Sequence, residues 1–169
     1  MTELRVISSV IYSPVAQKII LGAKESHLKE CDQLLSDAIT YSLGKFLSQS
    51  SADFLLPIPS RKSAVRLRGR QFITEIAKDG SDKFGIPITN PLLHSRTVRD
   101  QSGLHLNDRW NNLEGAFVVK REHGLRGSVL LIDDLVTTGA TLCEAARALR
   151  YAGIEVVGAV TAALAQPLR

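Results

Sequence analysis

Residues 129–141 read VLLIDDLVTTGAT, and this stretch specifies the central part of the predicted fold. The apolar run at residues 129–132 is typical of a strand that is buried on both faces of a parallel sheet. Asp133 and Asp134 predict the end of that strand, because two carboxylates inside an apolar core carry a large desolvation cost. Residues 137–141 then predict the start of a helix. Open α/β sheets bind their ligands at this carboxyl edge of the strands, so the stretch marks a candidate site.

The residues that follow complete a βαβ unit. Apolar residues recur at helical spacing from Leu142 to Leu149, and Gly153 is typical of a helix C-cap. Residues 156–160 predict a second buried strand. A strand, a helix and a second strand in succession favour a mainly parallel sheet with helices on both faces, so we expect an α/β fold.

The N-terminal third predicts a strand and two helices. The strand is expected at residues 6–12, and a helix is expected to begin at Pro14. A longer amphipathic helix is expected at about residues 27–47, with an apolar stripe that includes Leu28 and Leu34. We expect this stripe to be buried.

The middle of the chain predicts shorter elements. A strand at residues 53–56 is expected to leave the sheet at Pro57, because proline cannot continue a central strand. Residues 72–77 have a helical apolar face, which we expect to close at Gly80. Short strands are expected at residues 92–93 and 116–119.

Length and composition indicate one folded domain. The 169 residues are 44% hydrophobic and 22% charged, which is ordinary for a globular protein and excludes a disordered chain. No apolar run reaches the ~18–20 residues that a membrane-spanning helix needs, and no secretory leader is recognisable. Cys31 and Cys143 have no neighbouring cysteine, which excludes a zinc ribbon and fits a reducing compartment. We expect a cytoplasmic protein with no membrane partner.

A run of basic residues follows the predicted strand at residues 53–56. The net charge is only +4, but residues 61–70 contain five basic side chains and no acid. Such a cluster is expected to bind phosphate groups or nucleic acid, or to be a solvated face. For Arg68 and Arg70, a solvated helix start and a ligand contact remain open alternatives. The chain has few aromatic residues for a protein that stacks single-stranded bases.

The loop at residues 137–141 has the chemistry of a phosphate site. Backbone N–H groups at the start of a helix and the positive end of its dipole favour an anion. Three threonine hydroxyls add donors, and Gly139 lets the backbone approach closely. Asp133 and Asp134 would repel a phosphate, so we expect them to face sugar hydroxyls or a bound Mg²⁺. The whole stretch therefore suggests a phosphorylated ribose, although Thr-Thr-Gly alone would also suit ordinary helix capping.

Residues 129–141 resemble the 5-phosphoribosyl-1-diphosphate signature of the type I phosphoribosyltransferases. The resemblance implies that Asp133 and Asp134 contact the ribose hydroxyls, directly or through metal-bound water. It also implies Mg²⁺ as cofactor, phosphoribosyl diphosphate as substrate and a nucleobase as acceptor. The residues that would surround the 5-phosphate are Thr137, Thr138, Gly139, Ala140 and Thr141.

Residues 56–61, LPIPSR, resemble the strand end and diphosphate loop of the ComF (competence protein F) branch of this family. The resemblance implies that Ser60, Arg61 and Lys62 meet the diphosphate, the most anionic part of the ligand. Lys24 loosely resembles a lysine near the start of the domain in the same branch.

Segments of the C-terminal half resemble the same branch. QSGL at residues 101–104, the R-x-x-N pattern at 109–112 and GAF at 115–117 match it in spacing and identity. The resemblance implies a loop that folds over the substrate. The residues of this loop that would contact the substrate are Arg96, Arg99 and Gln101.

Two features depart from the ComF branch. Many ComF proteins begin with a cysteine-rich zinc ribbon, whereas this chain starts directly in the transferase-like domain. The branch pattern R-G-F-N-Q is replaced by RGRQF at residues 68–72, so roles at its last three positions are not carried over. We expect residues 1–169 to form a single domain, with a small N-terminal hood and packing helices at about 1–52 and the core at about 53–169.

Three functions stay open at this level. The first is a Mg²⁺-dependent phosphoribosyltransferase with an unidentified acceptor, linked by its resemblance to natural competence. The second is a non-catalytic module that binds a nucleotide, single-stranded DNA or competence proteins, since a fold does not dictate a function. The third is a nucleobase salvage enzyme. Type I transferases are often dimers, so a homodimer is an expectation from the resemblance alone.

Overall fold

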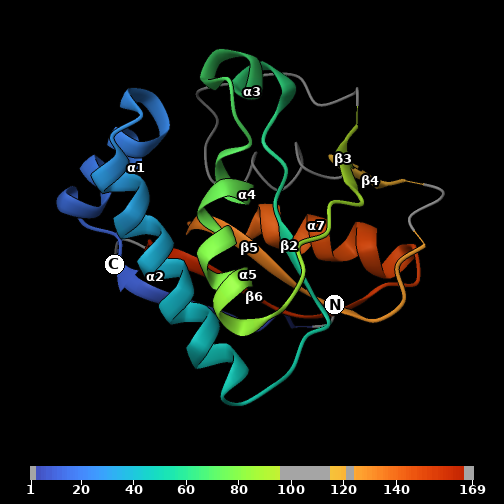
Figure 1. Cartoon of the computed structure of the whole chain (residues 1–169). Coiled ribbons are helices and arrows are strands. Elements are labelled where there is room, and N and C mark those ends of the chain that lie inside the picture. The colour runs from blue at the N-terminus through green and yellow to red at the C-terminus, as the bar shows by residue number, and fades with distance from the viewer. Residues whose placement is uncertain (1–2, 96–114, 121–123, 166–169) are drawn as a thin grey trace.

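The computed structural model describes residues 3–95, 115–120 and 124–165 (Figure 1). Its centre is a four-stranded sheet with the strand order β1-β6-β5-β2, in which every neighbouring pair is parallel. The strands are β1 (Val6–Ile11), β2 (Phe54–Pro57), β5 (Ser128–Val136) and β6 (Glu155–Leu164). The predicted α/β fold with a mainly parallel sheet is confirmed. β1, from the segment expected to form a hood, lies in this sheet beside β6.

Helices cover both faces of the sheet (Figure 1). Alternating side chains of β5 divide the core, since Leu130 and Ile132 enter one cluster and Leu131 enters the other. The first face is covered by α1 (Pro14–Ser26), α2 (Lys29–Leu47), α4 (Phe72–Ile76) and α5 (Lys78–Phe84). The second is covered by α7 (Ala140–Tyr151) and an antiparallel ribbon of β3 (Leu92–His94) and β4 (Phe117–Val119). The short helix α3 (Lys62–Arg68) follows β2.

α2 buries a narrower stripe than its sequence predicts. Leu35, Ile39 and Leu43 are buried at the i, i+4 spacing, whereas Leu34 is 52% exposed. Successive residues of a helix are about 100° apart, so Leu34 lies outside the row that faces the sheet. Leu28, expected in the same stripe, precedes the helix as its N-cap and is also exposed. Among the helices of the described ranges, none is long and apolar enough to cross a membrane.

Two serines take buried places in α2 that apolar patterning does not predict. Ser36 Oγ donates to the Ile76 carbonyl at 2.9 Å, and Ser42 Oγ donates to the Thr161 carbonyl at 2.9 Å. Buried hydroxyls are tolerated only when they are hydrogen-bonded. These two bonds therefore fix α2 against α4 and against β6.

Gly80 does not close a helix, as the sequence predicts, but lies inside α5. The chain is helical to Phe84, and Gly85 takes the left-handed conformation at φ +65° as the C-cap. A Cβ added at Gly80 would lie 2.4 Å from Leu43 Cδ1 of α2. The prediction was wrong because this glycine serves the close approach of two helices instead of a turn.

β5 continues past the acids that were predicted to end it. Asp133 pairs with Thr161 and Leu135 with Ala163 in the parallel ladder to β6, and the strand ends at Val136. β6 runs to Leu164 and supplies partners for these backbone groups. The cost of burying two carboxylates was expected to end the strand. That cost applies to the side chains, whereas the backbone of β5 stays hydrogen-bonded to β6.

Candidate functional site

The candidate site lies beside the end of β2, where β5 continues into its two acids. Pro57 pairs with Ile132, and the backbone N–H of Ile58 donates to the Ile132 carbonyl at 2.8 Å. Residues 58–61 therefore leave the sheet next to the acids of β5. The sheet thus brings together two segments that the sequence separates by about half of the chain.

Asp134 is buried and ion-paired. Its side chain is 6% exposed, and its Oδ2 pairs with Nζ of Lys24 from α1. Its backbone N–H donates to Asp133 Oδ1 at 2.9 Å. A buried carboxylate needs such a partner, because an isolated charge in the interior is strongly disfavoured. In the sequence, Lys24 is marked only by a loose resemblance, because its partner lies far along the chain.

Asp133 titrates abnormally because of its surroundings. Burial raises the pKa of Asp133 well above its usual range, and the negative charge of Asp134 raises it further. The ammonium of Lys24 opposes these effects without cancelling them. The fold therefore disfavours the ionised form of Asp133. Perturbed carboxylates of this kind gather at functional sites.

The loop after β5 leads into the N-terminus of α7. Gly139 is the N-cap at φ +75°, a conformation that favours glycine, and it has no side chain to occupy the free N–H groups of the first turn. Thr138 Oγ1 accepts from the Ala140 N–H at 3.3 Å. Thr137 is exposed, and Thr138 and Thr141 are half-buried. The helix begins at Ala140, later than predicted, so residues 137–139 form a loop in front of its positive end.

The segment after β2 is held by the β3–β4 ribbon. His94 Nε2 donates to the Pro59 carbonyl at 2.7 Å, and its ring packs on Phe117 at 4.8 Å between centroids. Burial lowers the pKa of His94, the hydrogen bond to Pro59 opposes this shift, and the positive charge of Arg61 adds to it, so the neutral form of the ring is favoured. His94 supports the segment at residues 59–61, a role that sequence reasoning missed.

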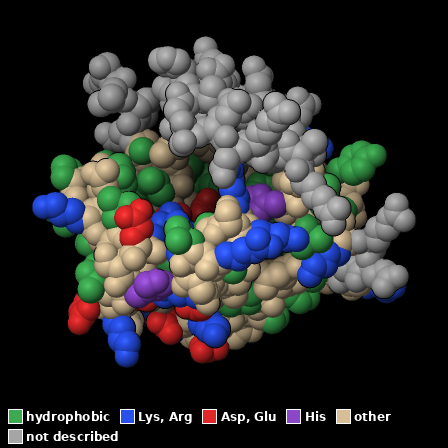
Figure 2. Space-filling model, turned by 90° about the horizontal axis from the view of Figure 1, so that it is seen from above, with side chains coloured by type: hydrophobic (Ala, Val, Ile, Leu, Met, Phe, Trp, Pro, Cys, Tyr) green, Lys and Arg blue, Asp and Glu red, His purple; other side chains and the backbone are tan. Residues whose placement is uncertain are grey.

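The predicted diphosphate residues occupy the turn from β2 into α3. Ser60 and Arg61 are half-buried, and Lys62 is exposed at the first position of α3. Arg66 in the same helix is also exposed. Figure 2 views the molecule from above, and Lys and Arg side chains gather on this face. The other predicted contacts, Arg96, Arg99 and Gln101, lie outside the described residues.

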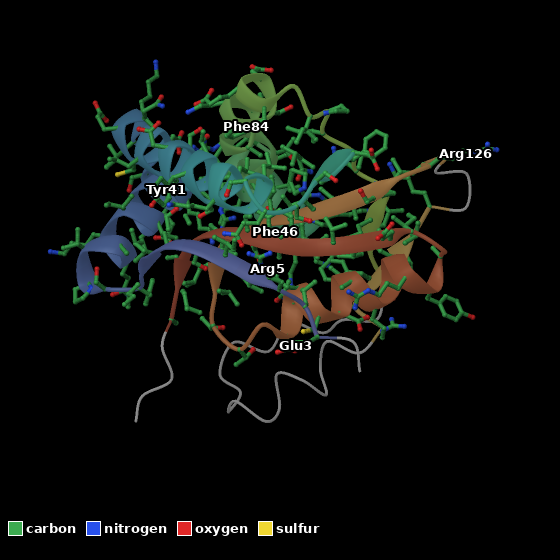
Figure 3. All side chains as sticks on the ribbon, turned by 90° about the horizontal axis from the view of Figure 1, so that it is seen from below. Glu3, Arg5, Tyr41, Phe46, Phe84 and Arg126 are labelled. Atoms are coloured by element: carbon green, nitrogen blue, oxygen red, sulfur yellow. The ribbon has the colours of Figure 1, made fainter. Side chains whose placement is uncertain are left out.

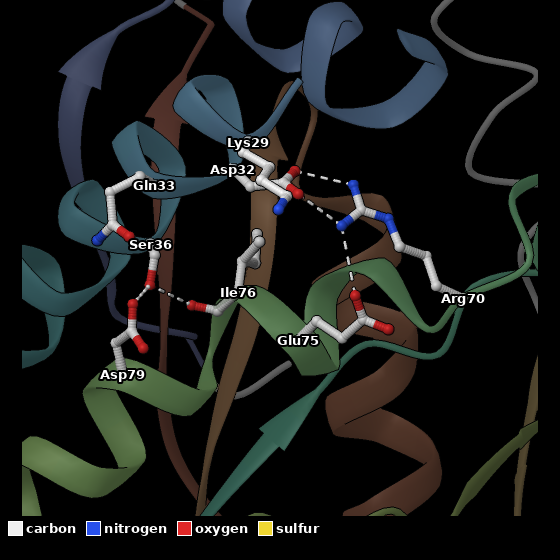
Figure 4. A pocket seen from close by; sticks show the side chains of 8 residues that line it. All are labelled: Lys29, Asp32, Gln33, Ser36, Arg70, Glu75, Ile76 and Asp79. Carbon is white, nitrogen blue, oxygen red and sulfur yellow. Dashed lines mark hydrogen bonds and ion pairs between the residues drawn. The ribbon is translucent and has the colours of Figure 1, made fainter. Parts of the chain in front are cut away.

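Arg70 belongs to the same basic run but is turned into the fold (Figure 4). Its two terminal nitrogens donate to the two oxygens of Asp32 at 2.7 and 2.8 Å, and to the Ala23 carbonyl at 2.7 Å. Its guanidinium lies 5.1 Å from the centre of the Phe72 ring. The side chain is 15% exposed. For Arg70, both sequence alternatives are therefore replaced by a third, a clamp between α1, α2 and the start of α4.

A pocket of about 290 Å³ lies beside this clamp, between α2 and the α4–α5 segment (Figure 4). Its lining mixes charges of both signs, from Lys29 and Arg70 to Glu75 and Asp79. Arg70 is bound to Asp32 and Glu75, and Ser36 is bound to Asp79. These contacts join lining residues to one another, and the pocket is separate from the carboxyl edge of the sheet.

The acid pair suits Mg²⁺ shared with a ligand better than a metal held by protein alone. Within the described ranges, no group of three or more His, Cys, Asp or Glu side chains is arranged to hold a metal ion. Mg²⁺ commonly uses one or two carboxylates together with water and substrate phosphates. Asp133 and Asp134 supply such carboxylates, although Lys24 already pairs with one oxygen of Asp134.

Known proteins resemble this chain in sequence and in fold. Competence protein F of Haemophilus influenzae is 33% identical over 107 residues, which cover 61% of this chain and 46% of that protein. This chain therefore spans about half the length of that relative. A crystal structure of adenine phosphoribosyltransferase matches with a TM-score of 0.53 and 11% identity, over 82% of this chain and 72% of the other.

A second solved structure has the same fold. It is adenine phosphoribosyltransferase from Saccharomyces cerevisiae, complexed with an iminoaltritol bisphosphate and adenine, with a TM-score of 0.52 and 13% identity over 82% of this chain and 71% of the other. At this level of identity the likeness concerns the fold. The phosphoribosyl transferase domain family matches residues 76–167, just over half of the chain, and this range includes both acids and the loop before α7. The chain belongs to the phosphoribosyl transferase domain family.

Proposed function

We propose that this chain binds 5-phosphoribosyl-1-diphosphate with Mg²⁺ and transfers the phosphoribosyl group to an acceptor. The observation that carries the proposal is the placement of an acid pair, a helix N-terminus and the basic β2–α3 turn on one edge of the sheet. A phosphate, a sugar diol and a diphosphate follow one another in this ligand. The three parts of the site have matching chemistry.

Each part of the ligand is assigned to one part of the site. Residues 137–141 hold the 5-phosphate with backbone N–H groups and threonine hydroxyls. Asp133 and Asp134 accept hydrogen bonds from the ribose hydroxyls, and charge-assisted bonds of this kind contribute about 1.5–3 kcal/mol each. Ser60, Arg61 and Lys62 bind the diphosphate.

The reaction displaces diphosphate from the anomeric carbon. A bond forms between an acceptor nitrogen and this carbon, the carbon–oxygen bond to diphosphate breaks, and its electron pair leaves with the diphosphate. The acceptor nitrogen loses its proton to solvent. Cations of the β2–α3 turn stabilise the departing charge, while the acids and the phosphate loop hold the sugar in line. Asp133 and Asp134 would hold Mg²⁺ through water, and a bound Mg²⁺ would supply further neutralisation of that charge.

Asp134→Asn is expected to weaken the binding of phosphoribosyl diphosphate about tenfold or more, the loss of ~1.4 kcal/mol. The variant keeps the shape of the side chain but loses the charge that strengthens hydrogen bonds from hydroxyls. Titration calorimetry with Mg²⁺ measures the dissociation constant. Asp82→Asn, an exposed change on α5, is the matched control and should bind like the wild type. Unchanged affinity in Asp134→Asn would remove the role assigned to Asp134.

Catalysis and acceptor are tested together. The protein is incubated with phosphoribosyl diphosphate, Mg²⁺ and single purine or pyrimidine bases, and released diphosphate is measured. Release that depends on one base supports transfer and identifies the acceptor, as a salvage enzyme requires. Tight binding with no release for any base contradicts catalysis with nucleobases while leaving the binding proposal intact.

A second candidate function is the binding of single-stranded DNA. It is favoured by the exposed Lys62 and Arg66 on α3 and by the name of the relative, competence protein F. Contacts with a phosphate backbone make affinity steeply salt-dependent. Lys62→Ala with Arg66→Ala should then lower the slope of log affinity against log salt by about 0.7 per lost contact. Fluorescence anisotropy with oligothymidine measures this, with Lys78→Ala as the control, and equal slopes would contradict this function.

A further inference from the structure

Lys24 connects the first helix of the chain to the acid pair. It lies near the end of α1, and its Nζ pairs with Asp134 Oδ2. Its side chain is 24% exposed, while that of Asp134 is 6% exposed. The same ammonium lies 5.8 Å from the centre of the buried Phe72 ring. The ion pair is therefore enclosed by α1, α4 and β5.

The backbone next to Lys24 is itself held in place. Arg70 donates to the carbonyl of Ala23, the preceding residue, at 2.7 Å, and it binds both oxygens of Asp32 at the start of α2. Arg70 and Lys24 both contact the ring of Phe72. The position of the ammonium is thus defined by contacts from α2 and α4 as well as by its own helix.

The ion pair makes the two acids different in geometry. Lys24 pairs with one oxygen of Asp134, Oδ2, whereas Asp133 Oδ1 accepts from the backbone N–H of Asp134. Two adjacent carboxylates repel each other, and the ammonium holds one of them by its opposite charge. Without the ammonium, Asp134 would be a buried carboxylate with no cationic partner, and its side chain would turn away.

We propose that Lys24 is a positioning residue of the phosphoribosyl site, which acts by holding the Asp134 carboxylate in one orientation so that its other oxygen accepts from a ribose hydroxyl. The inference rests on the proposed function, because it assigns Asp134 to the ribose. It makes α1 part of the site, although α1 lies outside the segment at residues 129–141 that carries the phosphate loop.

A double-mutant cycle tests whether Lys24 acts through Asp134. The probe is ribose 5-phosphate, which has the phosphate and the hydroxyls and is titrated without metal. Lys24→Met is expected to weaken its binding about tenfold, and Lys24→Met with Asp134→Asn should bind within about twofold of Asp134→Asn alone, because partners in one network are not additive. Lys24→Arg should recover most of the affinity. Lys18→Met, an exposed change on the same helix, should bind like the wild type.

The outcomes separate this inference from the proposed function. If the wild type binds neither ribose 5-phosphate nor phosphoribosyl diphosphate, the proposed function fails, and the role of Lys24 in it fails too. If the wild type binds but a folded Lys24→Met binds equally well, only the inference is overturned. The inference would also be overturned if the fold-losses of affinity of the two single variants multiply in the double variant, since Lys24 would then act independently of Asp134. Should Lys24→Met not fold, Lys24→Gln, which keeps a hydrogen-bond donor without the charge, is measured in its place.

Discussion

Asp133→Asn should make the protein more stable at pH 7 while weakening the binding of phosphoribosyl diphosphate about tenfold or more. Burial and the charge of Asp134 oppose the ionised form of Asp133 in the folded state. Asparagine carries no charge, so the variant lacks this destabilisation and its folded state is more stable. The same change removes a charged acceptor from the proposed ribose site. Stability and ligand binding thus move in opposite directions, as is common where a site is strained for function.

The pH dependence follows from the raised pKa of Asp133. The pKa of an aspartate in an unfolded chain is about 3.9. Asp133 takes up its proton at a higher pH in the folded state. Below the pKa of the unfolded state, Asp133 is protonated in both states and does not change the free energy of unfolding. As the pH rises from there through the folded pKa, the unfolded state ionises first and stability is lost. The gain from Asp133→Asn should therefore be largest at neutral pH and vanish in acid.

Thermal unfolding between pH 4 and pH 8 measures this difference. For a chain of this length, ~1 kcal/mol corresponds to about 2–4 °C in Tm, so a gain of a few degrees at pH 7 is readily seen. Asp82→Asn, which changes an exposed carboxyl, should follow the wild type at every pH. A lower Tm of Asp133→Asn at pH 7, or a gain that does not depend on pH, would contradict this account of Asp133.

Gly158→Ala should lower the free energy of unfolding by about 3 kcal/mol, at the upper end for overpacking of a core. A Cβ at Gly158 of β6 would lie 2.5 Å from Cε2 of Phe46 and 2.9 Å from the Arg5 carbonyl. Neither neighbour can easily move. Phe46 is fully buried with the Arg5 guanidinium 5.5 Å from its ring centre (Figure 3), and the Arg5 carbonyl accepts from the Ala159 N–H.

Urea unfolding of the variant checks this expectation. Phe46→Leu shortens the side chain that the new methyl group meets, so the double variant should lose less stability than the two single losses together. Such non-additivity would identify the steric contact as the cause. Wild-type stability of Gly158→Ala would show that β6 can move away from α2 at little cost.

Local patterns in the sequence were sufficient for the elements that carry the site. The apolar run of β5 and the spacing of α7 predicted a strand and a helix that the structure contains, although α7 begins at Ala140, later than predicted. The expectation of a parallel sheet with helices on both faces is confirmed as well. The roles of the site residues, the metal and the substrate stay predictions. Apolar residues that recur at the spacing of a strand or a helix are neighbours along the chain, so these elements can be predicted from local sequence.

Boundaries and exposure were less predictable, because they depend on partners elsewhere in the chain. The acids did not end β5, since β6 continues to offer hydrogen bonds beside them. Gly80 did not end a helix, since its lack of a side chain is used against Leu43. Composition cannot distinguish a glycine of a turn from a glycine of a close contact.

The network around the acids could be found only after folding. Arg70 reads as one more charge in a basic run, yet it is turned inward to Asp32 and Ala23. Lys24 becomes the counter-ion of Asp134 because packing of α1 over the sheet brings their side chains together. Such contacts join residues of different elements, and neither partner shows the other in its own local sequence. Short-range chemistry therefore specified the strand and the helix, while long-range packing set the surroundings and the ion pairing of the acids.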